Sequence, residues 1–256
     1  IPKKGIEKFF KTIEKIQHYL QGSKTVLSTA NETAIINEYF NLLGSNVLPK
    51  LFAMQPISIE IQHLTNKLAN KYSVCDKADG GHCNVFVIHN KLFIIDNNLH
   101  IQATDISNQT NSKLPNMTIV EGERIGNKIM FYDCLFYDSI DIRNKSLIER
   151  ITFIDKFLKI ISPNRFEFVS LDINKNSDLD SILNFHGTEI DKYVSHISNV
   201  ETESMYYDRK FFMHSNGLFD GEIFAYAKLG WEKFVNLPYN LDGLIFTCIA
   251  QKYKSG

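Results

Sequence analysis

The sequence predicts an α+β fold in which an antiparallel sheet follows a helical N-terminal extension. Apolar residues recur every three or four positions near the start of the chain, whereas short β-rich runs separated by turn residues begin at residue 72. No internal repeat or low-complexity linker appears in the chain. We therefore expect a helical extension over residues 1–55 and one α+β domain over residues 56–256.

The N-terminal extension is expected to contain two helices. Between Ile6 and Leu20 the apolar side chains repeat at helical spacing with lysine and glutamate between them, which is the pattern of an amphipathic helix. A second helical stretch covers Glu32 to Leu43, and Pro56 closes the extension.

A meander of antiparallel strands is expected next. Asn90-Lys91 and Gly126-Asn127 supply turns between neighbouring strands. The expected strands cover residues 72–74, 84–89, 92–95, 118–121 and 128–136.

Helices dominate the expected second half. Residues 145–161 keep helical spacing up to Pro163, where a helix should stop. In a later helix, Ile223, Tyr226 and Trp231 are expected to pack into the core. The remaining expected elements are a strand at 166–171, helices at 178–197 and 222–231, and a final strand at 244–249.

Charge and cysteine content narrow the class of protein. Lys and Arg number 28 against 29 Asp and Glu, a formal net charge of -1, so any polyanion must be met by a local patch. The four cysteines show no C-x-x-C pair and no histidine at zinc-ligand spacing, which argues against a disulfide framework or a structural zinc site. The apolar runs fall short of the ~18 residues that span a membrane. A cytoplasmic protein with no membrane partner is expected.

The stretch Asp76-Lys77-Ala78-Asp79-Gly80-Gly81 is the first candidate site. A lysine placed where a strand breaks into a glycine turn can present its amine at a cleft floor, and glycines let a phosphate approach the backbone closely. Taken alone, the same letters are typical of a solvated β-turn, since Asp-Gly is a common turn pair.

Three acidic clusters extend this candidate site. Glu121-Gly122-Glu123 ends an apolar strand, Phe131-Tyr132-Asp133 lies in the next one, and Asp242-Gly243 precedes an apolar run. Carboxylates at strand ends are poor core residues, and several from one sheet can converge on a divalent cation with the phosphates that it carries. The order of the four clusters therefore favours a nucleotide site over four separate surface turns.

These clusters resemble the motifs of covalent nucleotidyltransferases, the superfamily of mRNA capping guanylyltransferases and polynucleotide ligases. KADG at 77–80, EGE at 121–123 and LDGLIF at 241–246 resemble motifs I, III and IV, and FYDCL at 131–135 resembles an acidic strand of the family. The stretch from Lys210 to Trp231 looks like one that precedes motif IV in capping enzymes of large DNA viruses. The resemblance covers about residues 55–256 and implies an ATP-grasp-like nucleotidyltransferase domain. Asp-Gly in motif IV, where ligases usually carry Glu-Gly, favours guanylyltransferase.

The resemblance also implies roles for the motif residues. Lys77 would attack the α-phosphorus of GTP and hold GMP as a phosphoramidate, then pass it to the 5′-diphosphate end of RNA. Glu123 and Asp242 would hold Mg²⁺ or Mn²⁺, and Tyr132 would stack on guanine. The residues implied in nucleotide binding are Asp79, Gly80, His82, Glu123, Tyr132, Asp133, Asp242 and Gly243.

Two features depart from the family pattern. Motif I commonly carries arginine where this chain has His82, which cannot grip a phosphate or ribose with a guanidinium fork, and Arg124 is a candidate to replace that contact. Motif V and the OB-fold barrel of the family are expected beyond Gly256. The resemblance further implies triphosphatase and methyltransferase modules on the same or a partner chain and, for a viral protein, a location in the host cytoplasm or the virion.

Two other functions stay open from the sequence. An ATP-dependent RNA or DNA ligase would use the same lysine chemistry. A scaffold domain that keeps the fold without its chemistry would account for His82 and for the missing motif V.

Overall fold

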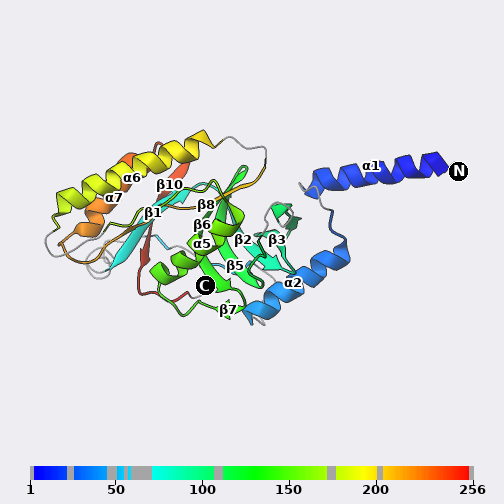
Figure 1. The fold of residues 1–256 in the computed structure, drawn as a ribbon, viewed down its shortest axis with the longest axis horizontal. Helices are drawn as coiled ribbons and strands as arrows, with labels where there is room; N and C mark the ends of the chain where they lie inside the picture. The colour runs from blue at the N-terminus through cyan, green and yellow to red at the C-terminus, as the bar shows by residue number, and fades with distance from the viewer. Residues whose placement is uncertain are drawn as a thin grey trace.

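The computed structural model describes residues 3–21, 26–44, 51–54, 57–58, 71–106, 112–171, 177–200 and 204–253, and its strands form two sheets (Figure 1). The smaller sheet has the strand order β10-β1-β9, and the larger has the order β4-β3-β2-β5-β6-β7 with β8 beside β6. Only the pairing of β6 with β8 is parallel among the described strands. This arrangement confirms a mixture of helices and antiparallel sheet.

The helices and strands begin and end at defined residues. The helices are α1 Lys3–Gln21, α2 Thr29–Leu43, α5 Leu147–Ile161, α6 Leu179–Asn199 and α7 Glu222–Phe234. The strands are β1 Tyr72–Ala78, β2 Gly81–Ile88, β3 Lys91–Asp96, β4 Ile101–Ala103, β5 Thr118–Ile125, β6 Lys128–Tyr137, β7 Ile140–Asp141, β8 Tyr206–Arg209, β9 Met213–His214 and β10 Leu241–Cys248.

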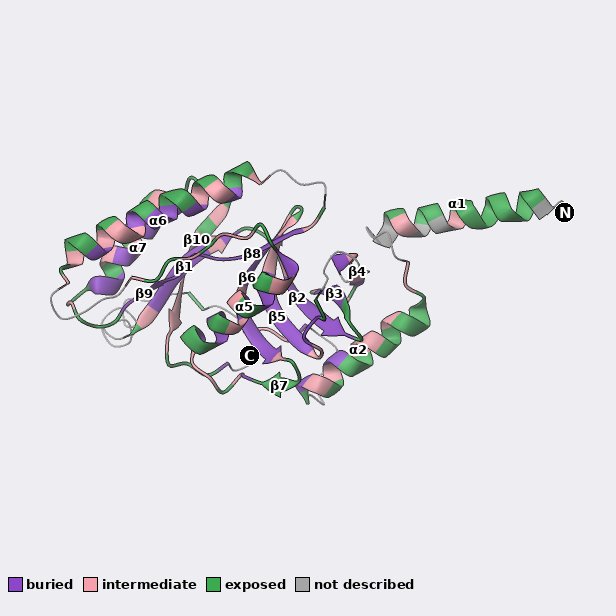
Figure 2. Cartoon of the chain, viewed as in Figure 1, coloured by how far each residue is buried: buried purple, intermediate pink, exposed green. Residues whose placement is uncertain are grey.

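The larger sheet is apolar on both faces, because a layer packs on each. Along β2, Val85 and Val87 belong to the core shared with α5, whereas Phe86 and Ile88 belong to the core shared with α2. Successive side chains of a strand point to opposite faces, so a strand covered on both sides becomes a continuous apolar run. Figure 2 shows these central strands as the most buried part of the molecule.

The smaller sheet is covered by α6 and α7. Val74 of β1 and Met213 of β9 share a buried cluster with Tyr193 of α6 and Phe234 of α7. The two helices also pack against each other. The two helices therefore support β1, the strand that carries the candidate lysine, by packing on one face of the smaller sheet.

The helix ends follow local capping chemistry. Ser146 and Glu149 form a capping box at the start of α5, in which each side chain accepts a hydrogen bond from the backbone N–H of the other residue. Asp178 caps α6 by accepting a hydrogen bond from Ser181 N at 2.8 Å. The helices expected at 145–161 and 178–197 are thereby confirmed.

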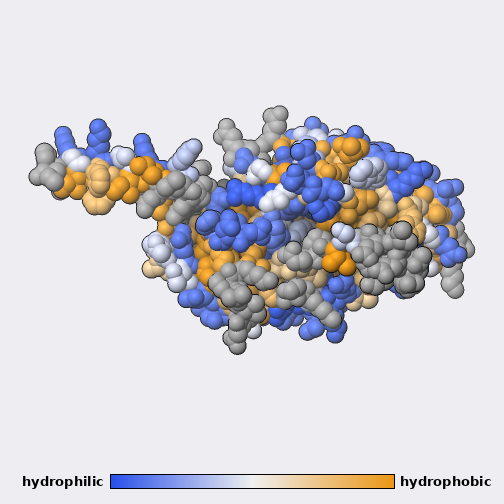
Figure 3. Space-filling model, turned by 180° about the vertical axis from the view of Figure 1, so that it is seen from behind, coloured by the Kyte–Doolittle hydropathy of each residue, from blue (hydrophilic) through white to orange (hydrophobic). Residues whose placement is uncertain are grey.

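The N-terminal helices differ in what covers them. Tyr39 and Leu43 of α2 are buried against the larger sheet. By contrast, α1 stands apart from the sheets and presents Phe9 and Phe10, each 63% exposed, on an apolar side visible in Figure 3. The expected domain boundary at residues 55 and 56 lies outside the described residues and stays a prediction. Among the helices that the structure describes, none has the length and apolar content that crossing a membrane requires.

Two expectations for the second half are wrong. Residues 166–171 form no regular strand: Phe166 N donates to the Asp208 carboxylate at 2.7 Å, and the rings of Phe166 and Phe168 pack against Tyr193 of α6. The alternating pattern therefore reflects aromatic packing rather than strand pairing. Trp231 is 61% exposed instead of buried, although Ile223 and Tyr226 of the same helix do lie in the core.

Candidate active site

Lys77 meets Asp242 where β1 and β10 run side by side. Both strands are longer than the sequence predicts, so Lys77 lies within β1, opposite Gly243 of β10, rather than in the turn after it. Lys77 Nζ is 2.6 Å from Asp242 Oδ2, and the two side chains are 36% and 49% exposed. An ion pair this exposed stabilises a fold by only about 0–1 kcal/mol. The Lys77 amine is therefore accessible to solvent while Asp242 holds it between β1 and β10.

Gly80 lies directly against Glu123. The Gly80 N–H donates to Glu123 Oε1 at 3.1 Å. A Cβ atom at Gly80 would stand 2.6 Å from Glu123 Cγ and 2.8 Å from the backbone oxygen of Arg124. Only glycine allows this approach, which holds the turn between β1 and β2 against β5.

The backbone of the turn and of β10 is also specialised. Asp79 is exposed, and its N–H donates to Asn240 O at 2.9 Å, which fastens the turn to the residue that precedes β10. Gly243 has a φ of 140°, a conformation that other residues rarely adopt. Glycine at 243 therefore shapes the backbone next to Asp242.

His82 occupies the position of the motif I arginine and is fixed by two acceptors. Its Nε2 lies 2.7 Å from Glu121 Oε1, and its Nδ1 lies 3.1 Å from Asn97 Oδ1. Burial lowers the pKa of His82, but the hydrogen bond to Glu121 and its charge outweigh burial and raise that pKa above 6.5. His82 thus keeps a positive charge at higher pH than an ordinary histidine.

Tyr132 and its neighbour Phe131 point in different directions. Phe131 is fully buried and packs against Phe157 of α5. The Tyr132 ring lies 6.2 Å from the His82 ring and 5.6 Å from the Nζ of Lys210. Tyr132 is therefore the aromatic residue of this strand that lies beside motif I, and its stacking on a base stays a prediction.

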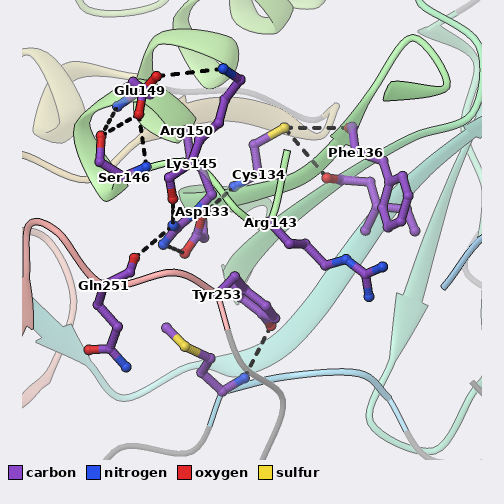
Figure 4. A network of polar contacts seen from close by, with 12 residues as sticks. Asp133, Cys134, Phe136, Arg143, Lys145, Ser146, Glu149, Arg150, Gln251 and Tyr253 are labelled. Atoms are coloured by element: carbon purple, nitrogen blue, oxygen red, sulfur yellow. Dashed lines mark hydrogen bonds and ion pairs between the residues drawn. The ribbon is translucent and has the colours of Figure 1, made fainter. Parts of the chain in front are cut away.

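Asp133 does not join the group around Lys77. Figure 4 shows its carboxylate beside Arg150, which donates from Nε to Oδ1 at 2.6 Å and from Nη2 to Oδ2 at 2.9 Å. Both side chains are almost fully buried. Burial raises the pKa of Asp133 to about 6, and Arg150 acts in the opposite direction. Both carboxylate oxygens thus serve the fold, and the predicted nucleotide contact of Asp133 stays untested.

Three residues near the site were missed by sequence reasoning. Lys210 Nζ bonds to Glu123 Oε2 at 2.6 Å, and Glu121 holds His82. Arg150 holds Asp133. Glu121 belongs to the EGE motif and Lys210 opens the stretch that resembles viral capping enzymes, so both had a visible signal without an assigned role, whereas Arg150 had none. Arg124, the candidate replacement for the motif I arginine, instead donates to Gln102 at 2.7 Å.

Comparisons with known proteins point to one class. The family model described as mRNA capping enzyme, catalytic domain, matches residues 20–178, which include Lys77, Glu123 and Tyr132. The chain is 30% identical over 247 residues to a "Probable mRNA-capping enzyme" of Acanthamoeba polyphaga mimivirus, across 91% of this chain and 21% of that protein. It is 28% identical over 163 residues to "Uncharacterized killer plasmid pGKl-2 protein 3" of Kluyveromyces lactis, across 62% of this chain and 24% of that protein.

The family model covers more than half of the chain, which places the chain among the mRNA capping enzymes. The chain belongs to the family of mRNA capping enzyme catalytic domains. It spans only between a fifth and a quarter of the length of these relatives.

Proposed function

We propose that this chain is the guanylyltransferase domain of an mRNA capping enzyme, with Lys77 as the nucleophile. The observation that carries the proposal is the contact of 2.6 Å between Lys77 Nζ and Asp242 Oδ2. Residues 165 positions apart in the sequence, one from each of two candidate motifs, meet there at a partly exposed surface. The family to which the chain belongs supports the same assignment.

In the proposed first step, the neutral amine of Lys77 attacks the α-phosphorus of GTP. A nitrogen–phosphorus bond forms, the bond from the α-phosphorus to the bridging oxygen breaks, and pyrophosphate leaves. The proton of the amine is lost to solvent, which reaches both Lys77 and Asp242. In the second step a terminal oxygen of the 5′-diphosphate end of RNA attacks the same phosphorus, the nitrogen–phosphorus bond breaks, and the lysine nitrogen takes up a proton from solvent.

The other site residues would bind and orient the nucleotide. Tyr132 would stack on guanine, and the His82 ring beside it, whose pKa is raised by Glu121, would supply positive charge when protonated in place of the motif I arginine. Gly80 and Gly243 would keep the backbone close to the phosphates.

The carboxylates fit a hard divalent cation. Mg²⁺ in proteins commonly takes one or two carboxylates plus substrate phosphates. The exposed carboxylate of Asp242 offers one such ligand. Glu123 would be the second, through the lone pairs that remain beside its bonds to Gly80 N and Lys210 Nζ. Among the described residues there is no group of three or more His, Cys, Asp or Glu side chains that could hold a metal ion, so substrate phosphates would have to supply the remaining ligands. Mg²⁺ or Mn²⁺ would neutralise the triphosphate.

We also expect triphosphatase and methyltransferase modules on the same or a partner chain, in the host cytoplasm or the virion.

The test is retention of labelled nucleotide on denatured protein. The full-length protein is incubated with Mg²⁺ and α-labelled GTP or ATP, alongside Lys77→Ala and the control Lys91→Ala, which removes an exposed lysine of β3. A GTP-specific adduct that only Lys77→Ala loses supports the proposal. An ATP-specific adduct identifies a ligase, and no adduct from folded protein identifies a scaffold.

A further inference from the structure

Lys210 is a completely buried lysine in the segment between β8 and β9. Its side chain is 0% exposed, and burying an ammonium group costs several kcal/mol unless the charge is paired and hydrogen-bonded. Two carboxylates pair with its ammonium group: Glu123 Oε2 lies 2.6 Å from Nζ, and Asp76 Oδ2 lies 3.5 Å from it. Because an apolar side chain would fill this space without that cost, the buried ammonium group of Lys210 points to a role other than packing.

The partners of Lys210 all adjoin the candidate site. Its Nζ donates to Glu123 Oε2 at 2.6 Å and to the backbone oxygen of Asp76 at 3.0 Å, and lies 3.5 Å from Asp76 Oδ2. Asp76 immediately precedes Lys77, and Glu123 holds the Gly80 turn. One cation thus joins the strand that carries the nucleophile to the strand that carries the motif III carboxylate.

Lys210 reaches this site from the inner side. Neighbouring residues of a strand point to opposite faces, and the fully buried Asp76 faces Lys210 while Lys77 points outward to Asp242. Tyr239 donates to Asp76 Oδ2 at 3.3 Å, whereas the buried Asp76 Oδ1 has no hydrogen-bond partner among the described residues. Lys210 therefore supports the reacting groups without contacting the amine of Lys77.

We propose that Lys210 is a positioning residue that sets the orientation of Glu123 and the place of the β1 backbone before Lys77. This inference rests on the proposed function. Lys210→Met keeps a similar length but removes the cation, so Glu123 keeps only its hydrogen bond from Gly80 N and can turn away from β1. Since a misplacement of about 1 Å can cost about 100-fold in rate, we expect formation of the lysyl–GMP adduct at saturating GTP to slow by about that factor.

A double-mutant cycle tells whether Lys210 acts by positioning Glu123 or only by stabilising the fold. Glu123→Gln, Lys210→Met and the double variant are compared for single-turnover adduct formation in the full-length protein, with folding checked by circular dichroism. If Lys210 acts through Glu123, the double variant is no slower than the slower single variant. Glu222→Gln is the control, because Glu222 is equally buried on α7 and bonds to Ser215 and Tyr226 away from this network; its adduct rate should stay near that of the wild type.

The experiment distinguishes failure of the Lys210 role from failure of the proposed function. A wild-type rate in folded Lys210→Met, or rate losses that multiply in the double variant, would overturn the role of Lys210 and leave the proposed function standing. Absence of adduct from the wild type would overturn both. If Lys210→Met does not fold, Lys210→Arg keeps the charge with a different shape; slow adduct formation by folded protein supports the proposal, and a wild-type rate overturns it.

Discussion

Replacing Arg150 tests whether Asp133 serves the fold. Arg150 makes four hydrogen bonds with its guanidinium: two to Asp133, one to Lys145 O at 2.6 Å and one to Gln251 O at 3.0 Å. Breaking a buried ion pair by removing one partner costs about 3–5 kcal/mol, because the other charge stays buried without compensation. Typical domains are stable by only about 5–15 kcal/mol, so Arg150→Met should remove a large part of the stability.

Urea denaturation followed by circular dichroism measures this loss. Lys233→Met is the control: Lys233 Nζ is also 2.6 Å from its partner Asp191, but the two side chains are 31% and 58% exposed, so the loss should stay below about 1 kcal/mol. The double variant Asp133→Leu/Arg150→Met should lose less than the sum of its single variants. A loss of under about 1 kcal/mol in Arg150→Met, or loss of GTP binding in Asp133→Asn at unchanged stability, would show that Asp133 does not serve the fold.

Three further predictions concern the glycine contact and two histidines. Gly80→Ala forces a Cβ against Glu123 and should cost about 1–3 kcal/mol and slow adduct formation, whereas Gly81→Ala, whose Cβ would be 3.9 Å from its nearest neighbour, should do neither. Burial lowers the pKa of His186 from 6.5 to about 4, so the unfolded state takes up the proton first as pH falls and stability drops between those values. His186→Phe should shrink the loss measured by urea denaturation between pH 7 and pH 5 by about 1–2 kcal/mol; an unchanged slope would contradict this. His82 has a pKa raised above 6.5, so it stabilises the fold below that pH and less as pH rises through its raised pKa. His82→Asn should therefore lose more stability at pH 6 than at pH 9, and an equal loss at both would be contrary evidence.

Much of the fold could be predicted because its signals are local. The helix at 147–161 has both helical spacing and a capping box. Two-residue turns join β2 to β3 and β5 to β6, and turn residues in the sequence indicate both hairpins. The strands β8 and β9 have four and two residues, too few for alternation to be visible. The parallel pairing of β8 with β6 joins segments far apart in the sequence and leaves no local signal.

Some residues of the candidate site also have a local signal in the sequence, and others have none. Lys77, Gly80 and Asp242 could be found because glycine and charge interrupt apolar strands at these positions. The roles of Lys210 and Arg150 could not be predicted, since each depends on a carboxylate far along the chain: Glu123 lies 87 positions from Lys210, and the buried Asp133 lies 17 positions from Arg150. Asp133 looked like a ligand for the same reason: its partner is invisible until the chain is folded.

Mass spectrometry of the nucleotide adduct tests the central claim most directly. The full-length protein is incubated with GTP and Mg²⁺, digested under conditions that preserve the phosphoramidate, and the modified peptide is fragmented. We predict a single GMP on the side chain of Lys77. GMP attached to any other residue, with Lys77 unmodified, would contradict the proposed mechanism.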